Sequence, residues 1–251
     1  MGPPDECFAR WLRSLEERHL ADLAFPRVSS ALRALSSTYV ERRARLTHGA
    51  ALAGAGKRAA FALFYAPLHY LIVRAIVLAL PGARDAPATL VDLGCGTGAA
   101  GAAWAAAAAT PMDVIGIDRH PWALGEAART YRELGLRARV RRSNLAAARL
   151  PERPAAILAA WTINELADGP RDRLLERLLH RRRASRVLIV EPVASVVDGW
   201  WNGWRGEFLA RGGREDEWRL RTELPAIVAK LDRAAGLDHR ELTARSLWLA
   251  G

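Results

Sequence analysis

A glycine-rich segment near the middle of the chain constrains the fold more than any other feature. Residues 91–98 read VDLGCGTG; they end an apolar run at 89–93 and open an alanine-rich run at 98–109. Alanine is the strongest helix former, and a short apolar run is typical of a buried strand. Glycines permit a tight turn that a ligand can approach closely, and a helix N-terminus offers free N–H groups. The segment therefore predicts a strand, a ligand-binding turn and a helix.

Downstream of this turn, apolar runs alternate with helical patterns. Strands are predicted at 89–93, 114–117, 138–140, 157–161, 187–190, 241–243 and 246–250. Helices are predicted at 98–109 and 121–134, from 170 onward, and at 224–235. Such alternation is typical of an α/β fold whose mostly parallel sheet carries helices on both faces. We predict a Rossmann-like, seven-stranded sheet.

The chain before this sheet is predicted to be helical. Apolar stripes of helical spacing mark 8–23 and 27–46, and two apolar helices are expected within 59–80, separated at Ala66-Pro67 because a residue before proline avoids the helical region. Pro67, His69 and Arg74 interrupt this apolar stretch, so we interpret it as buried rather than membrane-spanning. We predict two domains, a helical cap at 1–86 and the α/β domain at 87–251.

Charge and cysteine content narrow the functional classes. The formal net charge is +10, and residues 1–88 and 89–251 contribute equally to it. An RNA partner would suit this charge, but an Arg-rich composition explains it as well. Two cysteines, Cys7 and Cys95, provide neither a disulfide framework nor a metal cluster, and the first residues lack the apolar core of a secretory signal. We expect a cytoplasmic protein without a metal and without a membrane partner.

An acidic residue twenty positions beyond the glycines indicates what the turn binds. Asp118 ends the second predicted strand, where a carboxylate can accept hydrogen bonds from both hydroxyls of a ribose. The glycine spacing alone leaves alternatives open. Gly94, Gly96 and Ala99 also satisfy the dinucleotide-binding pattern, so a nicotinamide or flavin cofactor is one alternative, and a structural turn without a ligand is another.

The segment resembles motif I of the class I methyltransferases that use S-adenosylmethionine (SAM), because Asp92 stands just before the glycines and Asp118 falls at the ribose-binding position. The resemblance implies SAM as the cofactor and places Asp92 near the methionine amino group. In that superfamily the third strand is a sheet edge, which suits the alternating arginines at 137–141. The expected cofactor-binding residues are Asp92, Gly94, Cys95, Gly96, Thr97, Gly98, Asp118, Arg119, Asn144 and Trp161.

Two later strand ends complete the expected site. Asn144 follows the third strand, where the superfamily contacts the adenine amino group, although an Asn in a turn is the alternative. Asn164 and Glu165 follow the fourth strand, which faces the transferred methyl group in class I enzymes, so they are the catalytic candidates. Glu165 could instead cap the next helix or form a surface ion pair.

Substrate contacts are less clearly marked. Tyr65 and His69 from the cap are candidates beside the methyl group. Trp200, Trp201 and Trp204 could stack on a planar acceptor as a substrate lid, or pin a long loop to the protein body as a hydrophobic cluster. No histidine is placed by the sequence as a base for hydroxyl methylation, and attack on a sulfonium methyl can proceed by positioning alone.

A second resemblance concerns the order of short motifs: LSSTY at 35–39, FYAPLHY at 64–70, Asn164-Glu165-Leu166 and Val190-Glu191-Pro192. This order resembles the mitoribosomal small-subunit methyltransferase-like family, although the cysteine cluster of that family is missing here. Three hypotheses follow: a small-molecule methyltransferase, which we favour; an rRNA- or ribosome-directed methyltransferase; and a SAM-binding assembly factor without catalysis. An enclosed apolar pocket beside Asn164 would favour the first, a basic groove beside the glycines the second, and a blocked path to the methyl group the third.

Overall fold

A computed structural model describes residues 6–41, 52–180, 184–193 and 199–250. In this part of the chain seven strands form one sheet in the order β3-β2-β1-β4-β5-β7-β6. The strands are β1 (Thr89–Leu93), β2 (Asp113–Asp118), β3 (Arg137–Arg142), β4 (Ala156–Ala160), β5 (Arg186–Glu191), β6 (Arg214–Leu220) and β7 (Leu242–Ala250). β1 to β5 pair in parallel, and β7 lies antiparallel between β5 and β6. The predicted Rossmann-like α/β sheet is confirmed.

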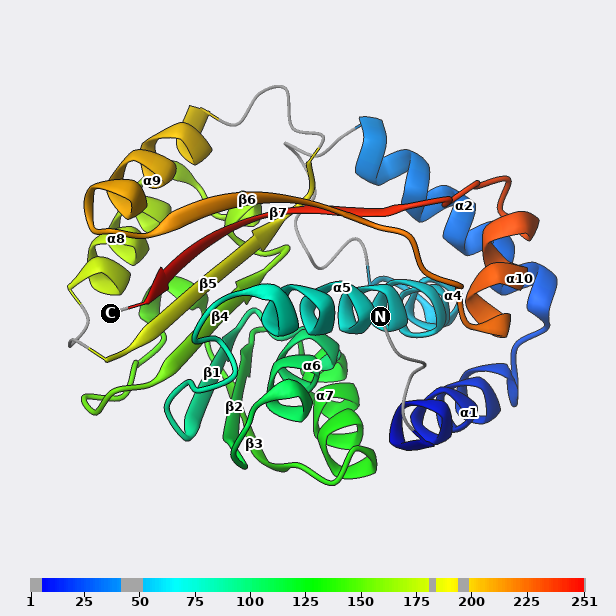
Figure 1. Cartoon of the computed structure of the whole chain (residues 1–251). Coiled ribbons are helices and arrows are strands. Elements are labelled where there is room, and N and C mark those ends of the chain that lie inside the picture. The colour runs from blue at the N-terminus through cyan, green and yellow to red at the C-terminus, as the bar shows by residue number, and fades with distance from the viewer. Residues whose placement is uncertain (1–5, 42–51, 181–183, 194–198, 251) are drawn as a thin grey trace.

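The central strands are buried on both faces, as their continuous apolar runs require. In β1, Leu90 packs in one apolar cluster while Val91 and Leu93 pack in the other, which is the period-two alternation of a strand. Helices α6 (Ala99–Ala107) and α7 (Pro121–Glu133) cover the first face. Helices α8 (Asp168–Leu179) and α9 (Gly199–Ala210) lie on the opposite side of the sheet (Figure 1). The two sides together enclose the strands.

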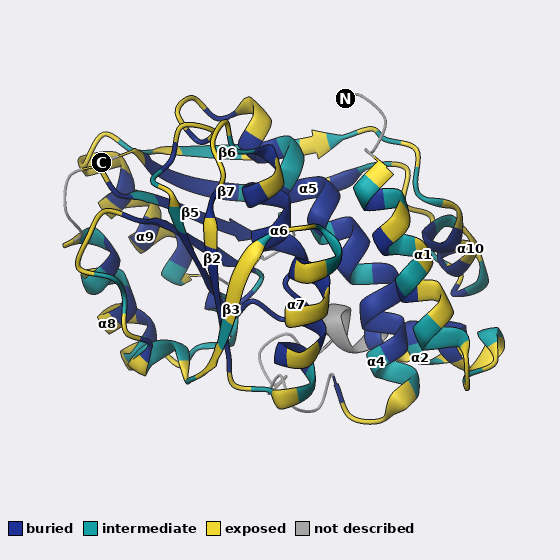
Figure 2. Ribbon diagram, turned by 90° about the horizontal axis from the view of Figure 1, so that it is seen from below, coloured by how far each residue is buried: buried dark blue, intermediate teal, exposed yellow. Residues whose placement is uncertain are grey.

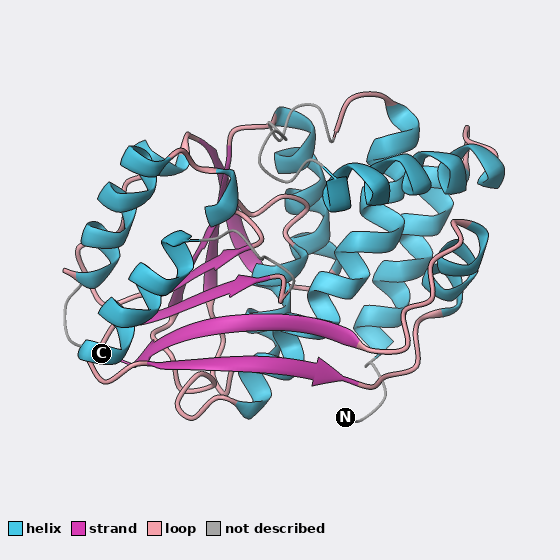
Figure 3. Cartoon of the chain, turned by 90° about the horizontal axis from the view of Figure 1, so that it is seen from above, coloured by secondary structure: helices cyan, strands magenta, loops and turns pink. Residues whose placement is uncertain are grey.

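Both edges of the sheet are charged. β3 reads RARVRR and is exposed along most of its length, which agrees with the predicted edge position (Figure 2). β6 forms the other edge, and its side chains pair along the strand, for example Arg219 with Glu217 at 2.8 Å. The strand prediction missed β6 because five of the seven residues in its sequence, REDEWRL, are charged. The two short strands predicted at 241–243 and 246–250 are instead one continuous strand, β7, which with β6 forms the long ribbon in Figure 3.

The apolar stretch before the sheet forms one helix, so the predicted break at Ala66-Pro67 is wrong. α4 (Ala55–Ala60) continues through a π-helical turn (Phe61–Tyr65) into α5 (Ala66–Ala79). The N–H of Ala66 bonds to the carbonyl of Phe61, five residues back, and this wider turn accommodates the proline ring that follows. By length and composition the helix could cross a membrane, and 72% of its apolar window is buried inside the protein. Burial of this kind is what we expected of a core helix.

The remaining helices gather around this long helix. They are α1 (Glu6–Leu20), α2 (Phe25–Glu41) and α10 (Ala226–Ala234). α1 is fixed to α7 by the Trp11 Nε1 bond to Thr130 Oγ1 at 3.3 Å and by the Arg18–Glu126 ion pair at 3.1 Å. α10 belongs to the C-terminal part of the sequence, yet it packs on α2 and on the π-helical turn. The predicted helix at 27–46 ends at Glu41 among the described residues, and 42–46 lie outside them.

One apolar cluster runs through this helical part and the sheet face. It joins Phe8 and Leu32 of the first two helices to Val73 of α5, Trp104 of α6 and Leu158 of β4. Helix α5 packs along α6, which itself lies on β1 and β2. Residues 1–86 and 87–251 therefore share a core across the described residues, and the division into two domains stays a prediction.

Candidate functional site

Two adjoining cavities lie at the carboxyl ends of β1 and β4. This is where the strand order reverses direction, and open α/β sheets bind ligands at that point. The larger cavity, here called the acceptor cavity, has a volume of about 260 Å³, and the smaller one, the ribose cavity, has about 40 Å³. Gly94 and Glu165 line both. An elongated ligand can therefore run from one cavity into the other.

The glycine turn forms the wall between β1 and the acceptor cavity. Gly94 has φ +66°, and a Cβ there would lie 2.1 Å from Thr162 Oγ1, so only glycine fits. Gly96 has φ +51°, and a Cβ there would meet only Phe61 Cε1 at 3.9 Å. The backbone at Gly96 is thus bare toward the cavity. Gly98, with φ +79°, is the N-cap of α6 and lines neither cavity; it packs against Tyr131.

Asp118 lies in the ribose cavity, at the end of β2. Its Oδ2 accepts from Gly96 N at 2.9 Å and its Oδ1 accepts from His120 N at 2.8 Å, which fixes the carboxylate against the glycine turn. Each carboxylate oxygen has a second lone pair, so the group can still accept hydroxyl donors. The expected ribose contact stays a prediction, and this position allows it.

Arg119 and Asn144 also line the ribose cavity. Asn144 caps a short 3₁₀ turn, Leu145–Ala147, by accepting from Ala146 N at 3.1 Å. The alternative of a turn asparagine thus describes its local role. Because the same side chain also faces the cavity, the expected adenine contact stays a prediction that is compatible with this geometry.

Asp92 lies beneath the glycine turn, and its contact with the methionine amino group, directly or through water, stays a prediction. The carboxylate is 1% exposed, lines neither cavity, and accepts from Gly101 N at 3.1 Å and from the Tyr131 hydroxyl at 3.2 Å. Burial raises the pKa of Asp92 to about 7. In this structure Asp92 ties β1 to α6 beneath the turn. Cys95 lines the acceptor cavity, and burial raises the pKa of its thiol well above the usual value, so it stays protonated.

The end of β4 carries Trp161, which adopts φ +54°, a left-handed conformation that is uncommon outside glycine. Its indole stacks on the imidazole of His69 from α5, with ring centroids 3.8 Å apart. Burial lowers the pKa of His69 to about 3, so this ring is neutral. The stack joins the long helix to the strand end inside the acceptor cavity.

Asn164 and Glu165 lie on a 3₁₀ turn, Ile163–Glu165, that follows Trp161. Glu191, at the end of β5, holds this turn because its Oε1 accepts from Ile163 N at 2.9 Å and from Asn164 N at 3.4 Å. Both catalytic candidates line the acceptor cavity. Helix α8 has Ala167 as its N-cap and no side-chain cap, so the alternative that Glu165 caps this helix is not what the structure shows.

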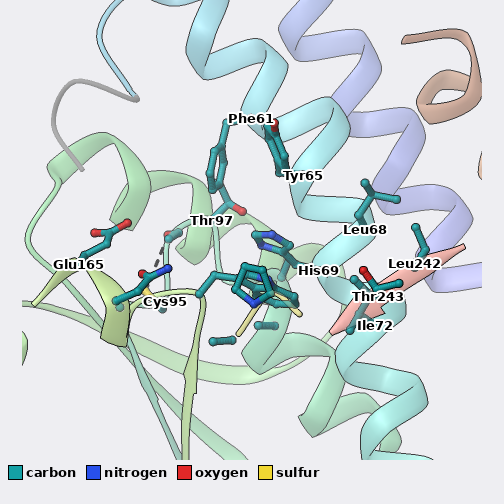
Figure 4. Close-up of a pocket in the computed structure, with 18 of the residues that line it drawn as sticks. Phe61, Tyr65, Leu68, His69, Ile72, Cys95, Thr97, Glu165, Leu242 and Thr243 are labelled. Atoms are coloured by element: carbon teal, nitrogen blue, oxygen red, sulfur yellow. Dashed lines mark hydrogen bonds between the residues drawn. The ribbon is translucent and has the colours of Figure 1, made fainter. Parts of the chain in front are cut away.

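The long helix forms the opposite wall. Figure 4 shows Phe61, Tyr65 and His69 projecting from it, with Leu242 and Thr243 of β7 at one end of the cavity and Glu165 at the other. Burial raises the pKa of Tyr65 to about 12, so its hydroxyl stays protonated. Tyr65 and His69 are therefore beside the candidate reacting edge, as expected, and their contact with a substrate stays a prediction.

The expectation that Trp200, Trp201 and Trp204 form a lid over the site is wrong. They lie on helix α9, and they line neither cavity. Trp201 and Trp204 are each 2% exposed, and Trp201 Nε1 donates to Glu215 of β6 at 2.7 Å. Burial of aromatic side chains this large stabilises the fold more than leaving them exposed to solvent would. The alternative of a hydrophobic cluster is confirmed, although the segment is a helix rather than a loop.

The sequence interpretation missed three polar residues of the acceptor cavity: His239, Glu241 and Thr243. They lie at the start of β7 and in the loop before it, far along the chain from Glu165, the last site residue predicted after β4. No motif surrounds them. The only signal in the sequence was that His239 stands seven residues after Asp232, which lies near the end of the helix predicted at 224–235.

The residues present fit SAM. The nucleoside would lie with Asp118, Arg119 and Asn144, and the methionine part would lie along the glycine turn. Ala99 and Ala100, the first residues of α6, line the acceptor cavity, so the positive end of this helix faces the place where a carboxylate would lie. The bare backbone at Gly96 allows close approach of such a chain.

Part of this chain matches a known protein family, and its fold resembles solved structures. Residues 90–184 match the family model described as a methyltransferase domain. The mitomycin 7-O-methyltransferase MmcR has a similar structure, with a TM-score of 0.54 at 16% identity over 99% of this chain and 74% of that one. Magnesium protoporphyrin IX methyltransferase from Synechocystis PCC 6803, solved with bound SAM, gives 0.48 at 14% identity over 72% and 80%. Comparison with curated proteins gave no match.

The family match decides between the open alternatives for the glycine turn. It spans β1 to β4 and the helix after them, which includes all residues that line the ribose cavity and the glycine-turn side of the acceptor cavity. The match favours SAM over a nicotinamide or flavin cofactor and over a ligand-free turn. Residues 90–184 therefore match a methyltransferase domain, and the residues of the site fit SAM as its cofactor.

Proposed function

We propose that this protein transfers the methyl group of SAM to a small-molecule acceptor held in the acceptor cavity. The observation that carries the proposal is the cavity itself: about 260 Å³, beside Asn164, with mainly aromatic and apolar walls from the long helix. Small-molecule sites are concave, mostly apolar and supplied with a few polar groups. Its charged wall residues, Glu165 and Glu241, are acidic, which suits a neutral acceptor better than a polyanionic one.

The proposed chemistry depends mainly on positioning. When bound, SAM supplies a methyl group on a sulfonium, which is a good leaving group. Phe61, Tyr65 and the stacked His69–Trp161 pair hold the acceptor and exclude water from the cavity. The turn carrying Asn164 and Glu165, fixed by Glu191, would direct polar groups at the reacting edge.

Calorimetry of SAM binding tests the cofactor site, with Asp118→Ala as the variant and NADH as the control ligand. We expect micromolar SAM binding that the substitution weakens about tenfold or more, which is about 1.4 kcal/mol. Arg240→Gln is a matched control, because Arg240 is exposed and pairs with Asp238 away from the ribose cavity. Preference for NADH, or no effect of Asp118→Ala, would contradict the site assignment.

Transfer of tritium from methyl-labelled SAM tests the acceptor class. Parallel reactions would contain a panel of small hydroxy- and amino-aromatic compounds, or intact small ribosomal subunits with their RNA. Labelling of the small compounds supports the proposal. Labelling of the subunits alone would favour the ribosome-directed alternative, and SAM binding without transfer to any acceptor would favour the assembly-factor alternative.

A further inference from the structure

A histidine and an aspartate that the sequence did not single out form a pair at the acceptor cavity. Asp232 of α10 is 5% exposed, and its Oδ1 lies 2.5 Å from His239 Nδ1. Its Oδ2 accepts from His239 N at 3.1 Å, so the carboxylate fixes both the ring and the backbone of this residue. His239 lines the acceptor cavity and packs edge-on against Phe64 at 5.6 Å.

The contact with Asp232 determines which ring nitrogen can take a proton. An ionised carboxylate only accepts hydrogen bonds, so His239 Nδ1 must carry a hydrogen. The neutral ring then has its lone pair on Nε2, on the side away from Asp232. A carboxylate that orients an imidazole in this way is the arrangement by which proteins prepare a histidine to act as a base.

The other titratable groups of the cavity are less suited to this role. His69 is stacked on Trp161, and its pKa of about 3 makes it a weak base, while the pKa of Tyr65 is about 12. Glu241 is paired with Arg221 at 2.8 Å. Glu165 lines both cavities and so faces the cofactor.

Resting on the proposed function, we propose that His239, oriented by Asp232, is the general base of this enzyme, and that the acceptor is an aromatic compound methylated on a hydroxyl group. Phe61, Tyr65 and the His69–Trp161 stack offer flat faces to an aromatic ring. A hydroxyl is a weak nucleophile until its proton is removed, so a base in the cavity suits this acceptor.

The step balances as follows. The hydroxyl proton of the acceptor passes to His239 Nε2, and the oxygen lone pair forms a bond to the methyl carbon. The bond between this carbon and the sulfonium sulfur breaks, and its electron pair stays on sulfur. The products are the methyl ether, S-adenosylhomocysteine and protonated His239, which then releases its proton to water.

Two phenols that differ in acidity test the base. 4-Methoxyphenol keeps its proton at neutral pH, whereas pentafluorophenol is largely ionised and needs no base. We expect His239→Gln to slow methylation of 4-methoxyphenol about 100-fold or more, the usual range for general-base catalysis, and to affect pentafluorophenol much less. His180→Gln is the matched control, because His180 lies at the exposed end of α8, away from both cavities. Equal loss with both phenols would overturn the proposal.

Nitrogen-15 NMR of the histidine rings gives a readout that does not depend on turnover. The chain has six histidines, and the His239 signals are those missing from His239→Gln. With S-adenosylhomocysteine bound, we expect hydrogen on Nδ1 only, a mixture of tautomers in Asp232→Asn, and a shift of the Nε2 signal when 4-methoxyphenol is added. Hydrogen on Nε2, or no shift with bound phenol, would overturn the proposal even if neither phenol is methylated.

Calorimetry separates this proposal from the proposed function. Binding of SAM together with failure of both phenols to bind the S-adenosylhomocysteine complex would overturn the hydroxy-aromatic acceptor and leave the methyltransferase in place. Failure of SAM itself to bind would overturn the proposed function, and this inference with it.

Discussion

The imidazole of His69 lies flat on the indole of Trp161, with ring centroids 3.8 Å apart and planes inclined by 6°. Trp161 adopts φ +54° directly after β4, a conformation that costs energy for a residue with a side chain. The stack gives this strained residue a packing partner on the long helix. It also connects the two walls of the acceptor cavity.

Loss of this stack should weaken the site more than it weakens the fold. Trp161→Ala removes an aromatic pair worth about 1 kcal/mol and frees His69 inside the cavity. We expect SAM affinity to fall about tenfold, equivalent to 1.4 kcal/mol, and urea unfolding to show a smaller loss of stability. Trp161→Phe is the matched variant, since it keeps a ring on His69 and should bind SAM nearly as the wild type does. Unchanged SAM affinity in Trp161→Ala would contradict this role.

Glu191 should make the stability of the protein depend on pH. Burial raises its pKa to about 8 from an ordinary value of 4.5. Between these values the folded protein retains a proton that the unfolded chain has released. The free energy of unfolding should therefore fall as pH rises from about 5 to about 8, by at most about 1.4 kcal/mol per pH unit, and level off above this range.

Urea unfolding of the wild type and Glu191→Gln across this range isolates the effect. The glutamine oxygen can still accept from Ile163 and Asn164 N–H but does not ionise, so the variant should lose less stability with rising pH. Burial also raises the pKa of Asp92, to about 7, which acts in the same direction in both proteins and cancels in their difference. Parallel curves for the two proteins would show that Glu191 does not titrate as described.

The glycine at position 94 is required by contact as well as by conformation. A Cβ there would lie 2.1 Å from Thr162 Oγ1, whereas Gly82 has a similar positive φ and open space around it. Gly94→Ala should therefore cost about 2–5 kcal/mol of stability, combining overpacking with left-handed strain, and Gly82→Ala only the strain of about 1–2 kcal/mol. Urea unfolding of both variants measures the difference. Equal losses would mean that the β1 and β4 turns do not pack as described.

The parts of the site that follow from sequence are those encoded locally. The glycine turn and Asp118 are separated by one helix, and their spacing alone places them at neighbouring strand ends. Local patterns likewise gave the first five strands to within two residues; β1, β2, β4 and β5 carry apolar runs, and β3 alternates arginine with Ala138 and Val140. β6 was missed because its apolar residues, Trp218 and Leu220, come only at the end of a mostly charged segment.

The remaining features depend on tertiary packing. His239 reaches the acceptor cavity only because α10 crosses to the helical side and packs on the π-helical turn. Asp92 turns beneath the glycine loop because Gly101 leaves room for its carboxylate; a Cβ there would lie 2.4 Å from Asp92 Oδ2. Neither arrangement can be inferred from residue types and spacing, since each depends on contacts between elements distant in the chain.

Trp204 tests the structural role of the tryptophan cluster. It is 2% exposed on α9, its ring centroid lies 5.4 Å from that of Trp200, and it packs with the apolar face of the central strands. Trp204→Ala should lower the free energy of unfolding by about 3–5 kcal/mol, because a large cavity remains. SAM affinity at a temperature where the variant is folded should not change, since Trp204 lines neither cavity. Trp204→Phe should lose less stability, because the indole Nε1 is buried without a partner among the described residues and its removal is not costly. Calorimetry and methyl transfer measure SAM affinity and acceptor turnover in folded Trp204→Ala. A fall in either would show that the tryptophan cluster contributes to the site.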